Sequence, residues 1–190
     1  MSEVYLKKAN KNPETGTSET REIVEKMLAE IEVGREGTAR KYAKDLDGFT
    51  GEVIISKEQI DQASKLVPQK LKDDIKFAHE RIKKFADAQK SSVNEFETEL
   101  SPGLWAGQKL IPIETAGCYV PGGRYAHVAS AIMSITTARV AGVENIIACS
   151  APKGEEGPNP AILYTMNYCG ADTILALGGV QAIASMAFGL

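Results

Sequence analysis

The sequence predicts an α/β protein in which an N-terminal helical region precedes an incomplete, doubly wound, Rossmann-like parallel sheet. The first hundred residues are charged and follow a helical period, whereas the last eighty are apolar and rich in glycine. Within those eighty, three short strand-like runs alternate with helical segments, and such βαβ units form parallel sheets. The composition changes near Ser101. We therefore expect a helical region over residues 1–100 that packs on the core, and the first part of a nucleotide-binding domain over residues 101–190.

The first two expected helices lie before residue 48. Ser18 can cap a helix that Gly34 ends, and a second helix over about 36–46 ends before Asp47 and Gly48. The apolar residues of the first helix recur at spacings of three and four, at Ile23, Met27, Leu28 and Ile31. This spacing predicts one buried face.

A short β-branched run over 53–55 precedes a third helix, which Ser56 and Gln59 open as a capping box and which continues to Leu66. Pro68 suits the first position of a long fourth helix. The face that this helix is expected to bury consists of Leu71, Ile75, Ala78, Ile82 and Phe85. We expect the charged faces of all these helices to be solvated surface rather than partner surfaces.

From residue 95 the hydrophobic period shortens toward two, which predicts strands. The expected strands are 96–100, 104–111 and 115–120, with breaks at Pro102–Gly103 and Pro112. After them we expect a helix over 127–141, a strand over 145–149, a helix over 160–168, a strand over 173–177 and a helix opened by Gly178–Gly179. The apolar segment at the end of the chain suits the approach to another strand, so we expect a fragment of a larger protein.

Composition excludes several classes of function. The formal charge of -3 leaves no excess of basic residues for a nucleic-acid backbone. No apolar run is long enough to span a membrane, and the N-terminus lacks the apolar core of a signal peptide, so we expect a cytoplasmic protein. Cys118, Cys149 and Cys169 suit buried, reduced thiols, and no cysteine or histidine cluster has metal-binding spacing.

Two glycine pairs follow expected strands, at residues 122–123 and 178–179. Glycine permits positive φ and close approach of the backbone to a ligand, and helix N-termini attract anions. Neither turn has the GxGxxG or GxxxxGK[ST] pattern, so an ordinary Rossmann or P-loop assignment is not supported. Tight strand-to-helix turns also use glycine for steric reasons alone, and this interpretation stays open.

Two blocks, "AGCYVPGGRYAHVASAIMSITTARVAGVENIIACSAP" and "CGADTILALGGVQAIASMAFG", contain the motifs YxPGG, ARxAG and GGxQAIA. In this order the motifs resemble the N-terminal half of the histidinol dehydrogenase family, and the likeness covers nearly the whole chain. The resemblance implies a homodimeric, zinc-dependent enzyme that uses two NAD molecules to oxidise a primary alcohol through an aldehyde to a carboxylate. The positions that it implies for dinucleotide binding are Tyr119, Pro121, Gly122, Gly123 and Gln181.

The residues after PGG, Arg124-Tyr125-Ala126-His127, depart from those of histidinol-oxidising members. They resemble the sulfopropanediol 3-dehydrogenase branch, which implies oxidation of 2,3-dihydroxypropane-1-sulfonate to sulfolactate; oxidation of histidinol to histidine is the alternative. A third possibility, of another class, is a truncated and inactive fragment that at most binds nucleotide or dimerises.

The resemblance also implies where the catalytic groups lie. The family's zinc ligands and catalytic residues follow the GGxQ helix, so we expect both downstream of Leu190. No metal ligand or catalytic residue is therefore assigned within the chain, and we expect the chain alone to be inactive.

Arg124 and His127 are the candidate substrate-binding residues. A guanidinium offers a planar fork of donors to an oxyanion, and a helix N-terminus adds partial positive charge, so this pair could hold a sulfonate or carboxylate. Alternatively, Arg124 pairs with a carboxylate at the surface or at a dimer contact, and His127 caps the helix. Cys118 has no recognisable base nearby in sequence, and we expect it to be a small buried hydrophobic residue.

Overall fold

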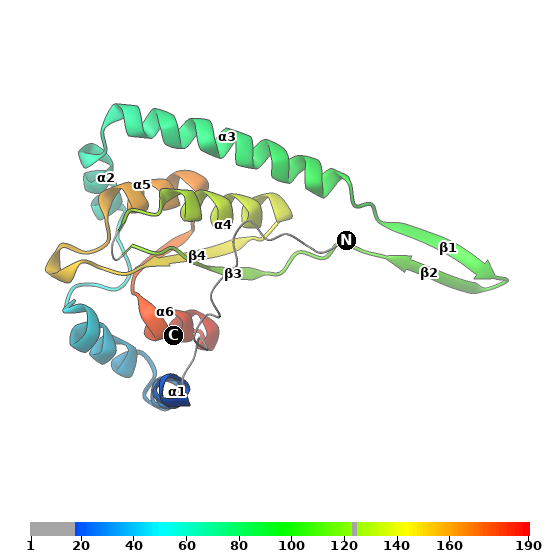
Figure 1. The fold of residues 1–190 in the computed structure, drawn as a ribbon. Coiled ribbons are helices and arrows are strands. Elements are labelled where there is room, and N and C mark those ends of the chain that lie inside the picture. Colours follow the sequence, from blue (N-terminus) through cyan, green and yellow to red (C-terminus); the bar gives the residue numbers. More distant parts are fainter. Residues whose placement is uncertain (1–17, 123–124) are drawn as a thin grey trace, which may run out of the picture.

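The computed structural model describes residues 18–122 and 125–190, and its core is a three-stranded parallel sheet with helices on both faces (Figure 1). The helices are α1 Ser18–Asp47, α2 Lys57–Leu66, α3 Gln69–Ser91, α4 Val128–Ala141, α5 Pro160–Cys169 and α6 Gly179–Phe188, with a single 3-10 turn at Gly154–Glu156. The strands are β1 Phe96–Ser101, β2 Leu104–Gln108, β3 Thr115–Tyr119, β4 Asn145–Ser150 and β5 Thr173–Ala176. The predicted α/β class is confirmed.

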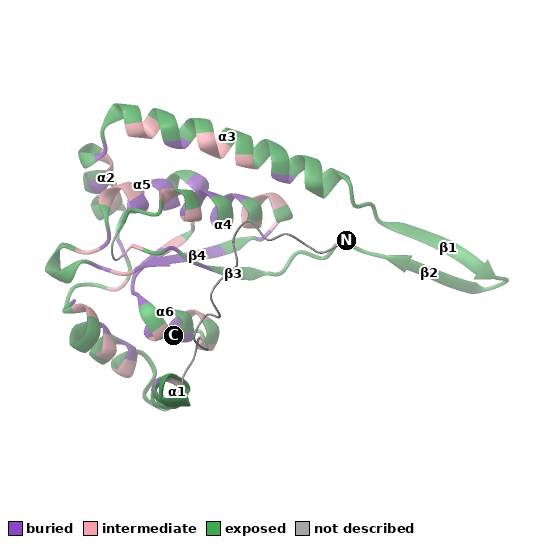
Figure 2. Ribbon diagram, viewed as in Figure 1, coloured by how far each residue is buried: buried purple, intermediate pink, exposed green. Residues whose placement is uncertain are grey.

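The parallel sheet has the strand order β3-β4-β5, with Thr115 opposite Asn145 and Ile147 opposite Thr173. Helices α4 and α5 lie on one face and are covered in turn by α3 and α2, whereas α6 lies on the other face against α1 (Figure 1). The buried core runs through the sheet and its helices (Figure 2). Its largest fully buried apolar side chains include Ile135, Ile146, Ile162 and Met166. No described helix is both long and apolar enough to cross a membrane.

The change of face at α6 marks a switch in the winding of the sheet. The two crossovers β3-α4-β4 and β4-α5-β5 use one face, and α6 then returns beneath the sheet to β3. Gly117 of β3 lies so close to α6 that a Cβ there would be 3.0 Å from Met186 Sδ. Ligands of doubly wound sheets bind beyond the carboxyl ends of the strands at such a switch.

The predicted run over 53–55 is an antiparallel addition to the outer edge of β5. The Ile55 N–H donates to Ile174 O at 2.9 Å, and the Ala176 N–H donates to Val53 O at 2.7 Å. The Ser56–Gln59 capping box is present as predicted. This segment therefore ties the helical region to the sheet.

The predicted break between the first two helices is confirmed: α1 consists of two helices joined at a kink at Arg35, next to Gly34, where φ is 52° and ψ is -144°. Two details of the helical region differ from the prediction. Pro68 is the N-cap of α3 rather than its first residue. Phe85, expected on the buried face, is 65% exposed, whereas its neighbour Ala86 is buried. The other predicted residues of that face are buried or packed partly buried against the core: Leu71, Ile75, Ala78 and Ile82.

The β1–β2 hairpin forms a separate two-stranded antiparallel sheet that projects from the body, and all of its residues are exposed (Figures 1 and 2). Strand β2 ends at Gln108, earlier than the predicted residue 111. The predicted division of the chain at residues 100 and 101 lies within this hairpin and stays a prediction.

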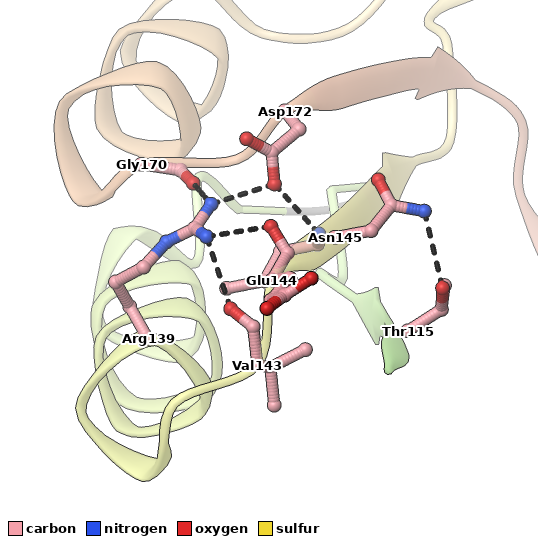
Figure 3. Close-up of polar contacts among 8 residues, drawn as sticks. Thr115, Arg139, Val143, Glu144, Asn145, Gly170 and Asp172 are labelled. Atoms are coloured by element: carbon pink, nitrogen blue, oxygen red, sulfur yellow. Dashed lines mark hydrogen bonds and ion pairs between the residues drawn. The ribbon is translucent and has the colours of Figure 1, made fainter. Parts of the chain in front are cut away.

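Arg139, from the ARxAG motif, joins the two loops that lead into β4 and β5, at the amino ends of the strands (Figure 3). Its guanidinium donates to the carbonyl oxygens of Val143, Glu144 and Gly170 at 3.0, 2.9 and 2.5 Å. It also pairs with Asp172 at 2.6 Å, and the same carboxylate oxygen accepts the Ile146 N–H at 2.7 Å. Arg139 is thus a structural residue at the edge of the sheet opposite to the glycine turns.

Candidate functional site

The two predicted glycine turns lie on the same edge of the sheet, on either side of the end of β4. A Cβ on Gly122 would collide with Ser150 Oγ and lie 3.4 Å from Ala151 O. A Cβ on Gly178 would lie 2.6 Å from Ala151 Cβ. Because the turns after β3 and β5 both press against the end of β4, only glycine fits at these positions without movement of the neighbouring groups.

Tyr119 links the two turns directly. The backbone N–H of Gly179, at the start of α6, donates to the Tyr119 hydroxyl at 3.3 Å. Gly179 has a φ of 55°, so the second glycine pair includes a residue with the positive φ that glycine permits. The Tyr119 side chain is partly exposed and makes no hydrogen bond through its own O–H to another described residue. It can therefore both contact a ligand through its ring and donate through its hydroxyl.

Gln181 is polar, yet it is only 1% exposed. Its Nε2 donates to Asp47 Oδ2 at 2.9 Å, across 134 positions of sequence. Its Oε1 has no hydrogen-bond partner among the described residues, and neither has the buried Ser150 Oγ. A buried polar atom without a partner costs about 1–3 kcal/mol. Two such oxygens at one edge of the sheet are what an added hydrogen-bonding ligand would satisfy.

The Asp47 carboxylate lies beside the second turn, 3.6 Å from the position that a Cβ of Gly178 would take. Partial burial raises the pKa of Asp47, and the hydrogen bond from Gln181 lowers it in part. The sequence predicts Asp47 only as the end of a helix. Neither its role nor that of Ser150 has a signal in the sequence, because each depends on contacts between distant segments.

The residues after the first turn are described only from Tyr125 onward. Gly123 and Arg124 lie outside the described residues, and their assigned roles stay predictions. His127 occupies the N-cap position of α4, as the helix-cap alternative expects, but its side chain makes no capping hydrogen bond. Its exposed imidazole lies edge-on to the Tyr125 ring, with ring centres 6.3 Å apart.

Leu190 marks the position beyond which the catalytic residues and zinc ligands are expected, and their placement there stays a prediction. Leu190 itself is 37% exposed, and its backbone N–H donates to Ser185 O at 3.0 Å, just after the end of α6. Gln181 lies in the first turn of α6, at the other end of the helix. Leu190 therefore takes no part in the candidate site.

The three cysteines are free and buried, as predicted. Burial raises the pKa of Cys118, and it raises the pKa of Cys149 to about 12 and that of Cys169 to about 11. Only a thiolate is a good nucleophile, so Cys118 is a buried apolar side chain rather than a reactive group.

Other parts of the described chain lack the chemistry of the glycine turns. An open groove between α3 and α4 is mostly apolar, with Ile111, Ile113 and Ala138 in its walls, and it has no comparable set of converging polar atoms. Among residues 18–122 and 125–190, no three histidine, cysteine or acidic side chains are grouped as metal ligands. The glycine turns therefore remain the candidate site.

Comparison with known proteins gives consistent matches over nearly the whole chain. A family model described as histidinol dehydrogenase matches residues 10–190. A "Histidinol dehydrogenase homolog" from Pelagibacter ubique is 55% identical over 100% of this chain and 45% of its own length, and a "Sulfopropanediol 3-dehydrogenase" from Ruegeria pomeroyi is 51% identical over 100% and 44%. The crystal structure of histidinol dehydrogenase from Elizabethkingia anophelis matches with a TM-score of 0.86 and 32% identity, over 93% of this chain and 41% of that one. The chain thus spans less than half the length of these relatives.

Proposed function

Because the chain belongs to the histidinol dehydrogenase family, we propose that it forms the dinucleotide-binding part of an NAD-dependent dehydrogenase, which oxidises a primary alcohol through an aldehyde to a carboxylate. One observation carries the proposal. Two glycine turns meet at the carboxyl edge of a doubly wound sheet, and beside them the buried oxygens of Gln181 and Ser150 lack partners among the described residues. This is the place and the chemistry that a dinucleotide requires.

The residues present fit NAD. Gly122 and Gly178 let both turns pack closely against the end of β4, since a Cβ on either would meet Ser150 or Ala151. Gln181 Oε1 can accept a hydrogen bond from a hydroxyl or amide group, whereas Ser150 Oγ lies beneath the Gly122 turn. When bound, NAD supplies the hydride acceptor for the oxidation.

The chain's own residues would bind and orient this group. The partly exposed Tyr119 ring can pack on a flat heterocycle while its hydroxyl stays fixed by the Gly179 N–H. The N-terminus of α6 adds partial positive charge, which favours a pyrophosphate. Pro121 and Gly123 belong to the proposed site through the YxPGG motif.

We extend the proposal to an anionic substrate, 2,3-dihydroxypropane-1-sulfonate, held by Arg124 and His127. Support comes from the exposed imidazole of His127 at the start of α4, which makes no capping hydrogen bond. It also comes from the 51% identity to the protein named sulfopropanediol 3-dehydrogenase. A sulfonate is a suitable partner for a guanidinium near a helix N-terminus. Histidinol, which carries an amine, is the substrate to be tested against it.

The remaining parts of the proposal rest on the family alone. They are zinc and catalytic residues, both supplied by segments downstream of Leu190, and a homodimer. Composition, rather than the family, supports a cytoplasmic location without a nucleic-acid or membrane partner. The three free, buried thiols suit a reducing compartment.

Calorimetric titration of the chain with NAD tests the binding step. We expect saturable binding that weakens about tenfold in Gln181→Met, which keeps the size of the side chain but removes its hydrogen bonds. Gln62→Met is the matched control, because Gln62 is exposed on α2. Absence of NAD binding, or equal affinities in the two variants, would contradict the proposed site.

Production of NADH tests the reaction. With zinc added, we expect no turnover by the 190-residue chain. A protein that extends this chain to the length of its relatives should oxidise dihydroxypropanesulfonate in preference to histidinol. In that protein Arg124→Ala should raise KM for the sulfonate; an unchanged KM would refute the anion-binding role, and turnover by the chain alone would refute its expected inactivity.

A further inference from the structure

Helix α1 holds α6 at both of its ends. Near the carboxyl end of α6, Arg35 Nη2 donates to Phe188 O at 3.0 Å and to Gly189 O at 3.4 Å. At the amino end, Asp47 Oδ2 accepts from Gln181 Nε2 at 2.9 Å. The second contact is the one that reaches the candidate site, because Gln181 lies in the first turn of α6.

The chemistry of the Asp47–Gln181 pair determines which way the glutamine amide faces. An aspartate carboxylate has only acceptors, so it takes the NH₂ end of the amide and turns the carbonyl end away from itself. Oε1 then lies over the start of α6, 3.1 Å from the position that a Cβ of Gly179 would occupy. There it is buried and has no partner among the described residues.

We propose that Asp47 is a positioning residue, which fixes the Gln181 amide so that Oε1 is presented to the dinucleotide as a hydrogen-bond acceptor. The ligand group received there is a donor, either a ribose hydroxyl or the carboxamide NH₂, and not a phosphate oxygen. This inference rests on the proposed NAD site.

Removal of the Asp47 charge distinguishes a positioning role of this residue from a role in packing alone. In Asp47→Asn the partner side chain has both a donor and an acceptor, so either orientation of Gln181 is satisfied and the acceptor is no longer imposed. Asp45→Asn is the matched control. It removes the same charge from the same helix, two residues away, on an exposed side chain.

Side-chain amide NMR of the ligand-free chain tests the orientation without NAD. In the wild-type chain and in Asp45→Asn, we expect slow exchange of the Gln181 NH₂ protons with solvent. In Asp47→Asn that exchange should be about tenfold faster, because the hydrogen bond from the Gln181 NH₂ to residue 47 then forms in only one of two possible orientations of the amide. Equal exchange rates in all three proteins would overturn the inference.

Discrimination between NAD and its analogues tests the ligand's donor. One analogue has an acetyl group in place of the carboxamide and so lacks the NH₂, and a set of deoxy analogues each lack one of the 2′- or 3′-hydroxyls of the two riboses. We expect wild type to bind one of these analogues about tenfold more weakly than NAD. That analogue identifies the donor, and in Asp47→Asn the preference for NAD over it should fall to about twofold.

The outcomes separate the two proposals. If wild type fails to bind NAD, the proposed function fails, whereas the NMR comparison still decides the orientation of Gln181. If wild type binds NAD but shows no preference over any analogue, the acceptor role of Oε1 is wrong. If Asp47→Asn weakens NAD and every analogue by the same factor, Asp47 supports the fold only, and the positioning role is overturned.

Discussion

Gly122 and Ser150 offer a direct test of how closely the first turn packs on the end of β4. A Cβ added at Gly122 would collide with the Ser150 hydroxyl and would lie 3.3 Å from Ile162 Cδ1. Ser150 is completely buried, so its hydroxyl cannot move into solvent. We therefore expect Gly122→Ala to destabilise the chain. In the double variant, Ser150→Ala should remove most of the collision that causes this destabilisation.

The magnitude follows from these contacts. Overpacking of a filled site costs about 1–3 kcal/mol, and we expect Gly122→Ala to fall within this range. The Ser150 hydroxyl has no partner among the described residues, so Ser150→Ala should leave stability unchanged or raise it by up to about 1 kcal/mol. With the hydroxyl gone, the contacts that remain for the new methyl group are those with Ile162 Cδ1 at 3.3 Å and Ala151 O at 3.4 Å. The double variant should therefore show a coupling of about 1–2 kcal/mol.

Urea unfolding followed by circular dichroism measures these differences. Gly37→Ala serves as the control for the exchange itself, because a Cβ at Gly37 meets open space on helix α1. We expect this control to be neutral or slightly stabilising. If Gly122→Ala costs the same free energy with and without the Ser150 hydroxyl, the collision is not the cause and the described packing of the turn is wrong.

Three other predictions concern groups away from the turns. Arg139→Met should lower the free energy of unfolding, measured in urea, by about 2 kcal/mol, because the hydrogen bonds to three carbonyl oxygens and to Asp172 are lost. An unchanged stability would contradict the network in Figure 3. Burial opposes ionisation of Asp172, but hydrogen bonds from the Ile146 N–H and Arg139 outweigh this effect and lower the pKa of Asp172. The difference in unfolding free energy between wild type and Asp172→Asn should therefore be fully present above about pH 4 and disappear as the pH falls further. Iodoacetamide at about pH 8 should leave all three cysteines unmodified in the folded chain and label all three in urea, because burial raises their pKa; rapid labelling of the folded chain would refute this.

Much of the fold could be predicted from local pattern. The parallel strands, the helices between them and the Ser56 capping box are short-range features, and the sequence carries their period and their end signals. The predictions are wrong where packing between neighbouring elements determines the structure. Phe85 has the right spacing for a buried face, but Ala86 is the residue that α3 buries at this turn of the helix. The break predicted at Gly34 is present, but the contact of the Arg35 guanidinium with the end of α6 is one that no local signal can indicate.

The site could be predicted only in part. The two glycine turns follow strands that are recognisable in the sequence, and parallel strands bring their carboxyl ends to one edge. The structure adds the polar atoms around the turns. Asp47 meets Gln181 across 134 residues, and Ser150 is hidden beneath Gly122, so both roles arise from packing. No pattern within one segment could have indicated either residue.

The separation of Asp47 from Gln181 has a consequence for the order in which the chain assembles. The two residues stand 134 positions apart, so their hydrogen bond closes a loop that includes most of the described structure. Contacts between such distant residues are slow to form, whereas helices and hairpins form early. In a refolding experiment, helical signal should therefore return before affinity for the dinucleotide does. During synthesis, the acceptor at Gln181 can be oriented only after α6 has left the ribosome and docked on α1.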